Sequence, residues 1–143
     1  MSSRSARRLR EKGRQTTGSF LMLPHQVMEH PAFKTLSRRA TKLFLDIGVA
    51  YRGHNNGDLA ATFKMMKERG WNSSDQLAKA KNELIERGLI MVTRQGGINL
   101  CTLYALTCFP IDQCGGKLDV PPTQVAPNSF KKWRAPRDGS KAA

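Results

Sequence analysis

The chain has 143 residues, of which 39% are hydrophobic, and this is enough for one domain with a modest core. No apolar run approaches the ~18 residues of a membrane-spanning helix, and the arginine-rich N-terminus lacks the apolar segment of a secretory signal. Because 24 basic residues stand against 11 acidic ones, the net charge is +13. We therefore expect a cytoplasmic protein with no membrane contact and an acidic partner.

The excess positive charge is concentrated near the two ends of the chain. Residues 1–15 hold six basic residues and one acidic residue, and residues 117–143 hold six basic and two acidic residues. Basic segments neutralise nucleic-acid phosphates and release condensed counterions, so this distribution favours a nucleic-acid partner. The alternative is that the basic ends only keep the protein soluble.

The cysteines do not predict a metal site or a disulfide framework. Cys101, Cys108 and Cys114 are odd in number and contain no CxxC pair, and the three histidines are scattered. The sequence therefore gives no reason to expect a metal ion or another cofactor.

We expect three parts along the chain: a disordered basic tail over residues 1–17, a domain over residues 18–112, and an extended Pro/Gly-rich arm with a basic tail over residues 113–143. The domain begins with a short helix, Pro24–Glu29, which Pro31 ends. A longer helix follows from the N-cap Ser37 to about Tyr51, because apolar residues recur there every three or four positions.

A second helix is expected over about Ala60–Arg69, after the turn-forming run RGHNNG and before the stop at Gly70. Its residues Leu59, Phe63, Met65 and Met66 are expected to point inward.

The third helix begins after Ser73, where Gln76 three residues later completes a capping-box pattern, and ends before Gly88. Its expected inward face is formed by Leu77, Ala80, Leu84 and Ile85.

A β-hairpin is expected directly after the third helix. Leu89–Thr93 is rich in strand-forming residues, Gln95-Gly96-Gly97 favours a turn, and Ile98–Thr107 alternates as a returning strand.

This order of helix, helix, turn, helix and hairpin resembles the winged-helix superfamily over roughly Ser37–Thr107. The run Ser73-x-x-x-Leu77-x-x-Ala80-x-x-x-Leu84-x-x-x-Gly88-Leu89-Ile90 is typical of winged-helix recognition helices. The runs FLMLPHQVMEHPAFKTLS, YRGHNNGDL and RQGGINLCTLYALTCFPID are similar to helix-turn-helix proteins of phages, prophages and plasmids, some of which resemble the N-terminal domain of phage replication protein O. The resemblance implies a mainly α fold with a small β hairpin, a winged helix-turn-helix, and binding to an origin or operator.

In such a fold the third helix enters the major groove of double-stranded DNA. Glutamine and asparagine side chains can pair with adenine and lysine can reach guanine, whereas an aspartate would have to face cytosine or cap the helix. The expected base contacts are Asp75, Gln76, Lys79 and Asn82.

Further contacts are expected to the DNA backbone and from the wing, the alternative in each case being a solvated surface. The expected backbone contacts are Arg38, Arg39, Lys42, Thr62, Ser73 and Ser74, and the expected wing contacts are Arg94 and Gln95.

The leading hypothesis is sequence-specific binding of double-stranded DNA, as a nucleoid-associated transcriptional regulator or replication-associated factor of a mobile genetic element. A non-specific nucleoid-type or RNA-binding protein is the alternative, and a winged helix that contacts protein is another. An enzyme has little support, because no phosphate-binding glycine motif or nucleophile–histidine arrangement occurs. The sequence leaves a homodimer open.

Overall fold

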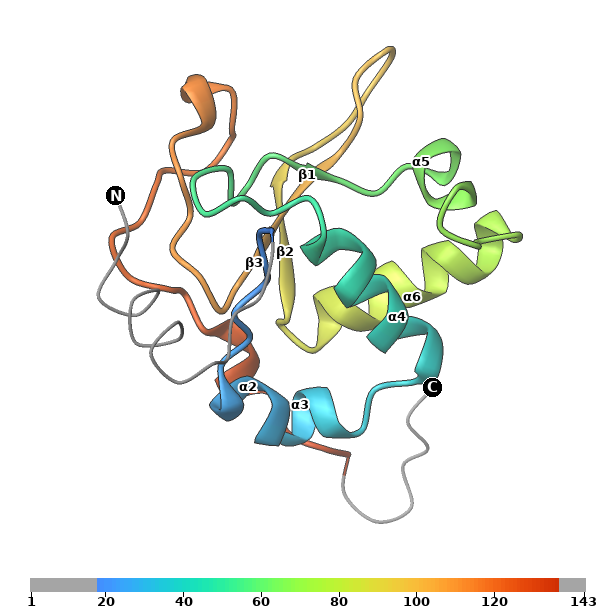
Figure 1. Ribbon diagram of the computed structural model, residues 1–143, viewed down its shortest axis with the longest axis vertical. Coiled ribbons are helices and arrows are strands. Elements are labelled where there is room, and N and C mark those ends of the chain that lie inside the picture. The colour runs from blue at the N-terminus through green and yellow to red at the C-terminus, as the bar shows by residue number, and fades with distance from the viewer. Residues whose placement is uncertain (1–17, 137–143) are drawn as a thin grey trace.

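The helices α4 (Arg38–Gly48) and α6 (Ser74–Glu86) pack against each other beside a small antiparallel sheet (Figure 1). They belong to a computed structural model that describes residues 18–136, in which five α-helices and three strands form a small mixed α/β domain. The basic tail expected over residues 1–17 lies outside the described residues. Within residues 18–136, no helix combines the length and the apolar character needed to cross a membrane.

Both long helices begin as their sequences predict. The Ser37 hydroxyl accepts a hydrogen bond from the Ala40 N–H at 3.1 Å, and the Ser73 hydroxyl accepts one from the Gln76 N–H at 3.2 Å. However, α4 ends at Gly48, and its expected extension to Tyr51 is wrong. The N–H groups of Ala50 and Tyr51 bond to carbonyls three residues earlier, so the chain tightens into a turn there.

The short helices fit the sequence less closely. Helix α2 (His25–Glu29) is confirmed, but Pro31 also starts a further helix, α3 (Pro31–Lys34), because a proline fits the first helical position. The second predicted helix shrinks to α5 (Phe63–Lys67), capped by Thr62. The prediction that Met65 and Ile85 point into the core is wrong, since these side chains are 45% and 37% exposed.

The sheet has the strand order β1-β3-β2, with β1 at Leu59–Ala60, β2 at Ile90–Arg94 and β3 at Leu103–Leu106. Strand β1 pairs with β3, so the sheet has one strand more than the expected hairpin, and residues 59–60 are not helical. The returning strand is much shorter than Ile98–Thr107. All four residues of β3 are buried, so both faces of this strand are covered and the expected alternation between its faces does not hold.

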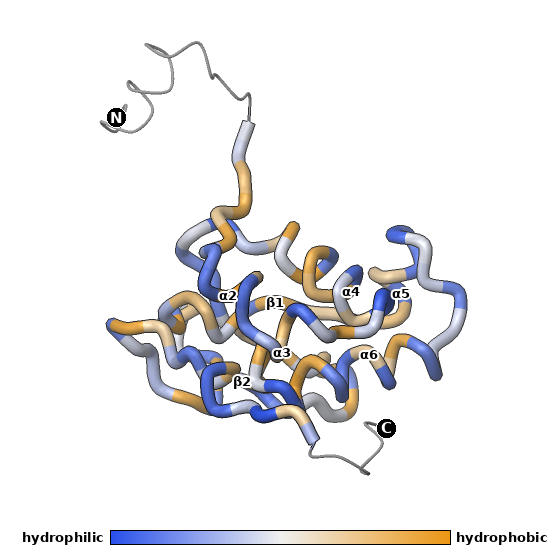
Figure 2. The backbone as a smooth tube through the Cα atoms, turned by 90° about the horizontal axis from the view of Figure 1, so that it is seen from below, coloured by the Kyte–Doolittle hydropathy of each residue, from blue (hydrophilic) through white to orange (hydrophobic). Residues whose placement is uncertain are grey.

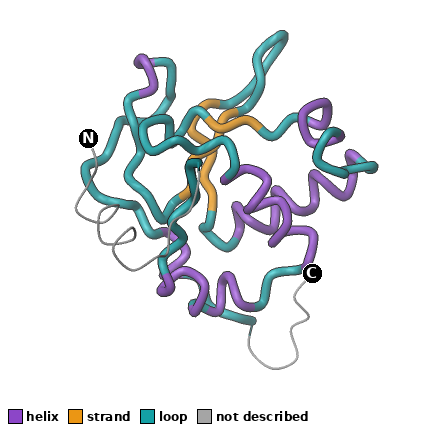
Figure 3. Tube along the Cα trace, viewed as in Figure 1, coloured by secondary structure: helices purple, strands orange, loops and turns teal. Residues whose placement is uncertain are grey.

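Residues 95–102, between β2 and β3, form a hairpin loop that projects away from the rest of the molecule (Figures 1 and 3). A register shift between Val92 and Arg94 separates this loop from the regular pairing. Its tip is a two-residue turn at Ile98 and Asn99, closed by mutual backbone hydrogen bonds between Gly97 and Leu100. The turn therefore lies after Gly97, and not at Gln95-Gly96-Gly97 as expected.

Residues 113–136, which we call the C-terminal strap, follow the surface of the domain. The Asp119 N–H donates to the Thr93 carbonyl at 2.7 Å, and the Asn128 N–H donates to the Thr107 carbonyl at 2.8 Å. The Phe130 side chain is fully buried, and its ring meets the His30 ring edge-on at 5.3 Å between centroids. The strap, expected as an extended arm, thus contributes to the same core as α4 and α6.

The carboxylate of Asp46 joins α4 to the turn between α5 and α6. Its two oxygens accept hydrogen bonds from Lys42 Nζ at 2.6 Å, Arg69 Nε at 2.8 Å and the Trp71 indole N–H at 2.8 Å. Lys42 also donates to the Arg69 carbonyl at 2.6 Å. No local sequence pattern indicates this network, because Arg69 and Trp71 are distant from Asp46 in the chain.

The pKa of Asp46 reflects two opposing effects. Burial raises the pKa of this carboxyl group, but the hydrogen bonds from Lys42, Trp71 and Arg69 favour its charged form and bring the pKa below the ordinary value. The carboxylate is therefore ionised at neutral pH and fixes the α5–α6 turn against α4.

Replacing Phe130 with alanine should lower the free energy of unfolding by about 3–5 kcal/mol, the usual cost of truncating a fully buried phenylalanine. Val125→Ala on the same strap is a suitable control, because Val125 is 74% exposed. Urea unfolding of both variants measures the difference. Equal stability of Phe130→Ala and the unmodified protein would mean that the strap does not pack on the core.

Asp46→Asn should lower the free energy of unfolding by about 2 kcal/mol at neutral pH, because it weakens hydrogen bonds to a charged acceptor. Since the pKa of Asp46 is lowered in the folded state, its stabilising effect is complete above the pKa of the unfolded chain and is lost as the pH falls through the folded pKa. The difference between the two proteins should therefore stay constant above about pH 5 and shrink as the pH falls below the ordinary aspartate pKa of about 3.9.

Asp75→Asn serves as the control for this series, because the Asp75 side chain is 76% exposed and its ion pair with Lys79 lies in solvent. A stability difference between Asp46→Asn and the unmodified protein that stays constant with pH would contradict the role given to Asp46.

Candidate nucleic-acid interface

The outward face of α6 presents the four residues expected to contact bases. Leu77, Ala80 and Leu84 are buried against the core, whereas the predicted base-contact residues are all exposed. At 3.6 residues per turn these four positions share one side of the helix. In Figure 2 the tube of α6 alternates between hydrophilic and hydrophobic stretches, as this division of faces requires. The exposed residues are Asp75, Gln76, Lys79 and Asn82.

Asp75 and Lys79 form an ion pair on this face, with 3.3 Å between Nζ and Oδ2. Both side chains are more than three-quarters exposed, so the pair is weak and Lys79 remains able to reach another acceptor. Asp75 is not the capping residue, since the Ser73 hydroxyl fills that role. Its charge lies in the first turn, where it interacts favourably with the helix dipole.

Two basic residues of α4 lie close to the start of α6. Arg39 and Lys42 line a shallow hollow of about 140 Å³ together with Trp71, Asn72 and Gln76. The Ser37 N–H donates to Glu83 Oε2 at 2.8 Å, which places the beginning of α4 against the middle of α6. The structure thus brings the expected backbone contacts on α4 next to the expected base contacts on α6.

The residues expected to contact the DNA backbone differ in their exposure and in the hydrogen bonds that they already make within the protein. Arg38, Arg39 and Ser74 are exposed. Lys42 already donates to Asp46 and to the Arg69 carbonyl, which leaves one of its three protons for an outside acceptor. The hydroxyls of Thr62 and Ser73 both accept hydrogen bonds as helix caps, and each can still donate its own proton.

Helix α5 adds basic residues that the sequence analysis did not select. Lys64 and Lys67 lie in its last turn and are exposed, and Lys67 Nζ lies 5.0 Å from the centre of the Phe63 ring. A helix-turn-helix places the first of its two helices across the DNA backbone. The signal that could have identified these residues was their position between Thr62 and Gly70, directly before the turn.

The two expected wing residues do not lie at the tip of the hairpin loop. Arg94 is half-buried, and its Nη2 donates to the Cys101 carbonyl at 2.9 Å across the base of the loop. The Gln95 side chain is exposed, while its backbone N–H donates to the Asp119 carboxylate of the C-terminal strap at 3.1 Å. The guanidinium of Arg94 is therefore engaged within the protein, and the tip carries Ile98 and Asn99 instead.

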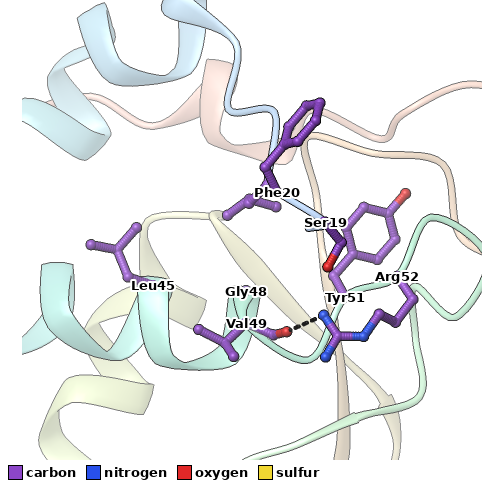
Figure 4. Close-up of a pocket in the computed structure, with 8 residues that line it drawn as sticks. Ser19, Phe20, Leu45, Gly48, Val49, Tyr51 and Arg52 are labelled. Atoms are coloured by element: carbon purple, nitrogen blue, oxygen red, sulfur yellow. Dashed lines mark hydrogen bonds between the residues drawn. The ribbon is translucent and has the colours of Figure 1, made fainter. Parts of the chain in front are cut away.

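A second hollow, of about 400 Å³, lies at the end of α4, away from the residues expected to contact DNA (Figure 4). Phe20, Leu45 and Val49 give it an apolar lining, and Arg52 is the one charged residue in that lining. The Arg52 guanidinium donates to the Val49 carbonyl at 2.9 Å. Ser19 and Tyr51 are the other polar residues of this lining, and the lining contains no histidine, aspartate or glutamate that could act as their base.

Within residues 18–136, no cluster of three or more histidine, cysteine, aspartate or glutamate side chains is arranged to hold a metal ion. Comparisons of the chain with protein-family models, with curated proteins and with solved structures found no match.

Proposed function

We propose that this protein binds double-stranded DNA in a sequence-specific manner through a winged helix-turn-helix. In this proposal α5 and α6 are the two helices of the motif, Gly70–Asn72 is its turn, and the hairpin loop between β2 and β3 is the wing. The order of the elements supports this assignment, because α4, α5, α6 and the hairpin follow one another as the winged-helix resemblance implies.

The exposed polar face of α6 is the observation that carries the proposal. Gln76, Lys79 and Asn82 are side chains that pair with base edges in the major groove, and they share one face of a capped helix. The opposite face is anchored on α4, and Asp46 holds the preceding turn. A helix fixed in this way can present three side chains in one orientation, as base recognition requires.

Basic residues around α6 would hold the DNA backbone. Arg39 lines a hollow together with Gln76 near the start of α6, Arg38 precedes it in α4, and Lys64 and Lys67 belong to the helix before α6. The net charge of +13 adds a general attraction for phosphates. In this proposal the protein binds DNA, catalyses no reaction and needs no cofactor. It is located in the cytoplasm, in association with the nucleoid.

The biological role that we propose is that of a transcriptional regulator or replication-associated factor of a phage, prophage or plasmid. It rests on the resemblance of the runs around Phe20, Tyr51 and Arg94 to proteins of such elements. Non-specific binding of DNA or RNA is the competing proposal, since charge alone would produce it.

Selection of binding sites from a randomised duplex library with the full chain tests the proposal directly. Specific binding predicts enrichment of one sequence motif. A palindromic motif would indicate a homodimer, because the symmetry of a site mirrors that of the protein. Direct repeats would indicate an initiator. If several rounds enrich no motif, the specific-binding proposal is wrong.

On the enriched duplex, Gln76→Ala and Asn82→Ala should each weaken binding by about 1–3 kcal/mol and relax the preference at one base pair. Gln124→Ala removes the same type of exposed side chain from the C-terminal strap and should have no effect. Fluorescence anisotropy with the enriched duplex and single-base variants of it measures both quantities. A uniform loss over all duplexes would instead assign Gln76 and Asn82 to backbone contacts.

The affinity should depend steeply on salt. If six to ten phosphates are neutralised, the association constant should fall by about 10³–10⁵ between about 50 and 200 mM salt. Titrations of the enriched duplex over this range give the slope. A nearly flat dependence would be incompatible with a binding surface formed by Arg38, Arg39 and the lysines of α5.

A further inference from the structure

The hairpin loop ends in an apolar tip, although the chain as a whole is strongly basic. Residues 95–102 contain no charged side chain. Ile98 at the turn is 95% exposed, and Leu100 beside it is 47% exposed. The tip therefore carries no positive charge that could form an ion pair with a phosphate.

The tip is also held in a defined shape. Gly97 and Leu100 exchange backbone hydrogen bonds of 2.9 and 3.1 Å, and Asn99 adopts a left-handed backbone conformation with φ of 57°. Below the turn, the Gly96 N–H donates to the Thr102 hydroxyl at 3.0 Å. A side chain at Gly96 would meet the Thr102 backbone nitrogen at 2.7 Å, so the two arms of the loop approach closely only because residue 96 is glycine.

The base of the loop is braced on two sides. Arg94 bridges to the Cys101 carbonyl within the loop, and Asp119 of the C-terminal strap accepts a hydrogen bond from the Gln95 N–H. The loop is thus a supported projection (Figure 1), and Ile98 lies in the turn at its end. Burying an exposed isoleucine against another surface is favourable, and little conformational entropy remains to be lost.

We propose that Ile98 enters the DNA minor groove and wedges between two base pairs, so that the protein bends the duplex it binds. This inference rests on the proposed function. The minor groove is about 6 Å wide, so a side chain at the turn can enter it where the whole hairpin cannot. Apolar side chains inserted there unstack a base step and kink DNA. Asn99 supports the same location, because its amide group can donate to the acceptors of adenine and thymine in that groove.

Insertion of Ile98 between base pairs explains why the loop carries no charged side chain, although α4 and α5 carry exposed basic residues. Phosphate contacts belong to α4 and α5, and the tip contributes burial of apolar surface instead. The step that receives Ile98 should be pyrimidine–purine, such as TA or CA, because these steps are the easiest to kink.

The test compares the unmodified 143-residue chain with Ile98→Ser, Ile98→Leu and Val125→Ser. Because Ile98 is 95% exposed, its replacement should not disturb folding, and Val125→Ser removes a similarly exposed apolar side chain outside the loop. The probes are the enriched duplex of about 30 base pairs, labelled with a donor and an acceptor dye at its ends, and a scrambled duplex of the same length. Energy transfer reports the bend, and anisotropy reports the affinity.

The unmodified protein, Ile98→Leu and Val125→Ser should bend the enriched duplex by about 20–90°. Ile98→Ser should lose most of the bend and about ten- to hundredfold in affinity, as expected when an isoleucine no longer leaves water. The wedge is wrong if Ile98→Ser bends and binds the duplex as the unmodified protein does, or if the unmodified protein binds the duplex without bending it. In either case the proposal of DNA binding stands, and Ile98 is available to a protein partner. If the unmodified protein binds neither duplex, the proposed function itself fails.

Discussion

The buried carboxylate of Asp46 is the constraint on which the arrangement of this domain depends. A charged group can be buried only where donors compensate for the loss of water, and here Lys42, Arg69 and the Trp71 indole provide them. These donors come from α4 and from the segment that joins α5 to α6. Their convergence fixes the turn before α6 relative to α4, whereas the apolar contacts of Leu77 and Leu84 alone would tolerate some sliding. Asp46 thus acts together with the buried face of α6 and the Ser37–Glu83 hydrogen bond to set the direction in which α6 presents its polar face.

This constraint also divides the basic residues into two groups with different tasks. Lys42 and Arg69 share the single negative charge of Asp46, so the three groups together keep a net charge of +1. Arg38, Arg39, Lys64 and Lys67 are exposed and remain available to phosphates. The hairpin loop differs from both groups, because Arg94 supports it from within and its tip is apolar. Phosphate attraction, base recognition and apolar insertion are thus assigned to separate elements in the proposed interface, and each can be altered without removing the others.

Local signals predicted the parts of the fold that local interactions determine. Ser37 and Ser73 mark the starts of α4 and α6, and Gly88 marks the end of α6, because caps and stops involve residues only a few positions apart. The outward position of Gln76, Lys79 and Asn82 followed from helical periodicity. In contrast, β1 has only two residues and exists through its pairing with β3, and Phe130 is buried by contacts with segments far away in the chain. A sequence pattern likewise does not show whether Lys42 and Arg94 are hydrogen-bonded within the protein, or which residues form the tip of the loop. Both depend on contacts with residues elsewhere in the chain.

The central claim is that the protein distinguishes one duplex sequence from others, rather than binding DNA by charge alone. Competition at physiological salt measures this most directly. The labelled enriched duplex is bound by the full chain, and an unlabelled duplex of random sequence is added in increasing excess. Because specific sites are bound at least about 10³-fold more tightly than random DNA, half of the complex should survive until the competitor reaches about that excess. Displacement in proportion to the mass of competitor would contradict the account and identify a non-specific binder.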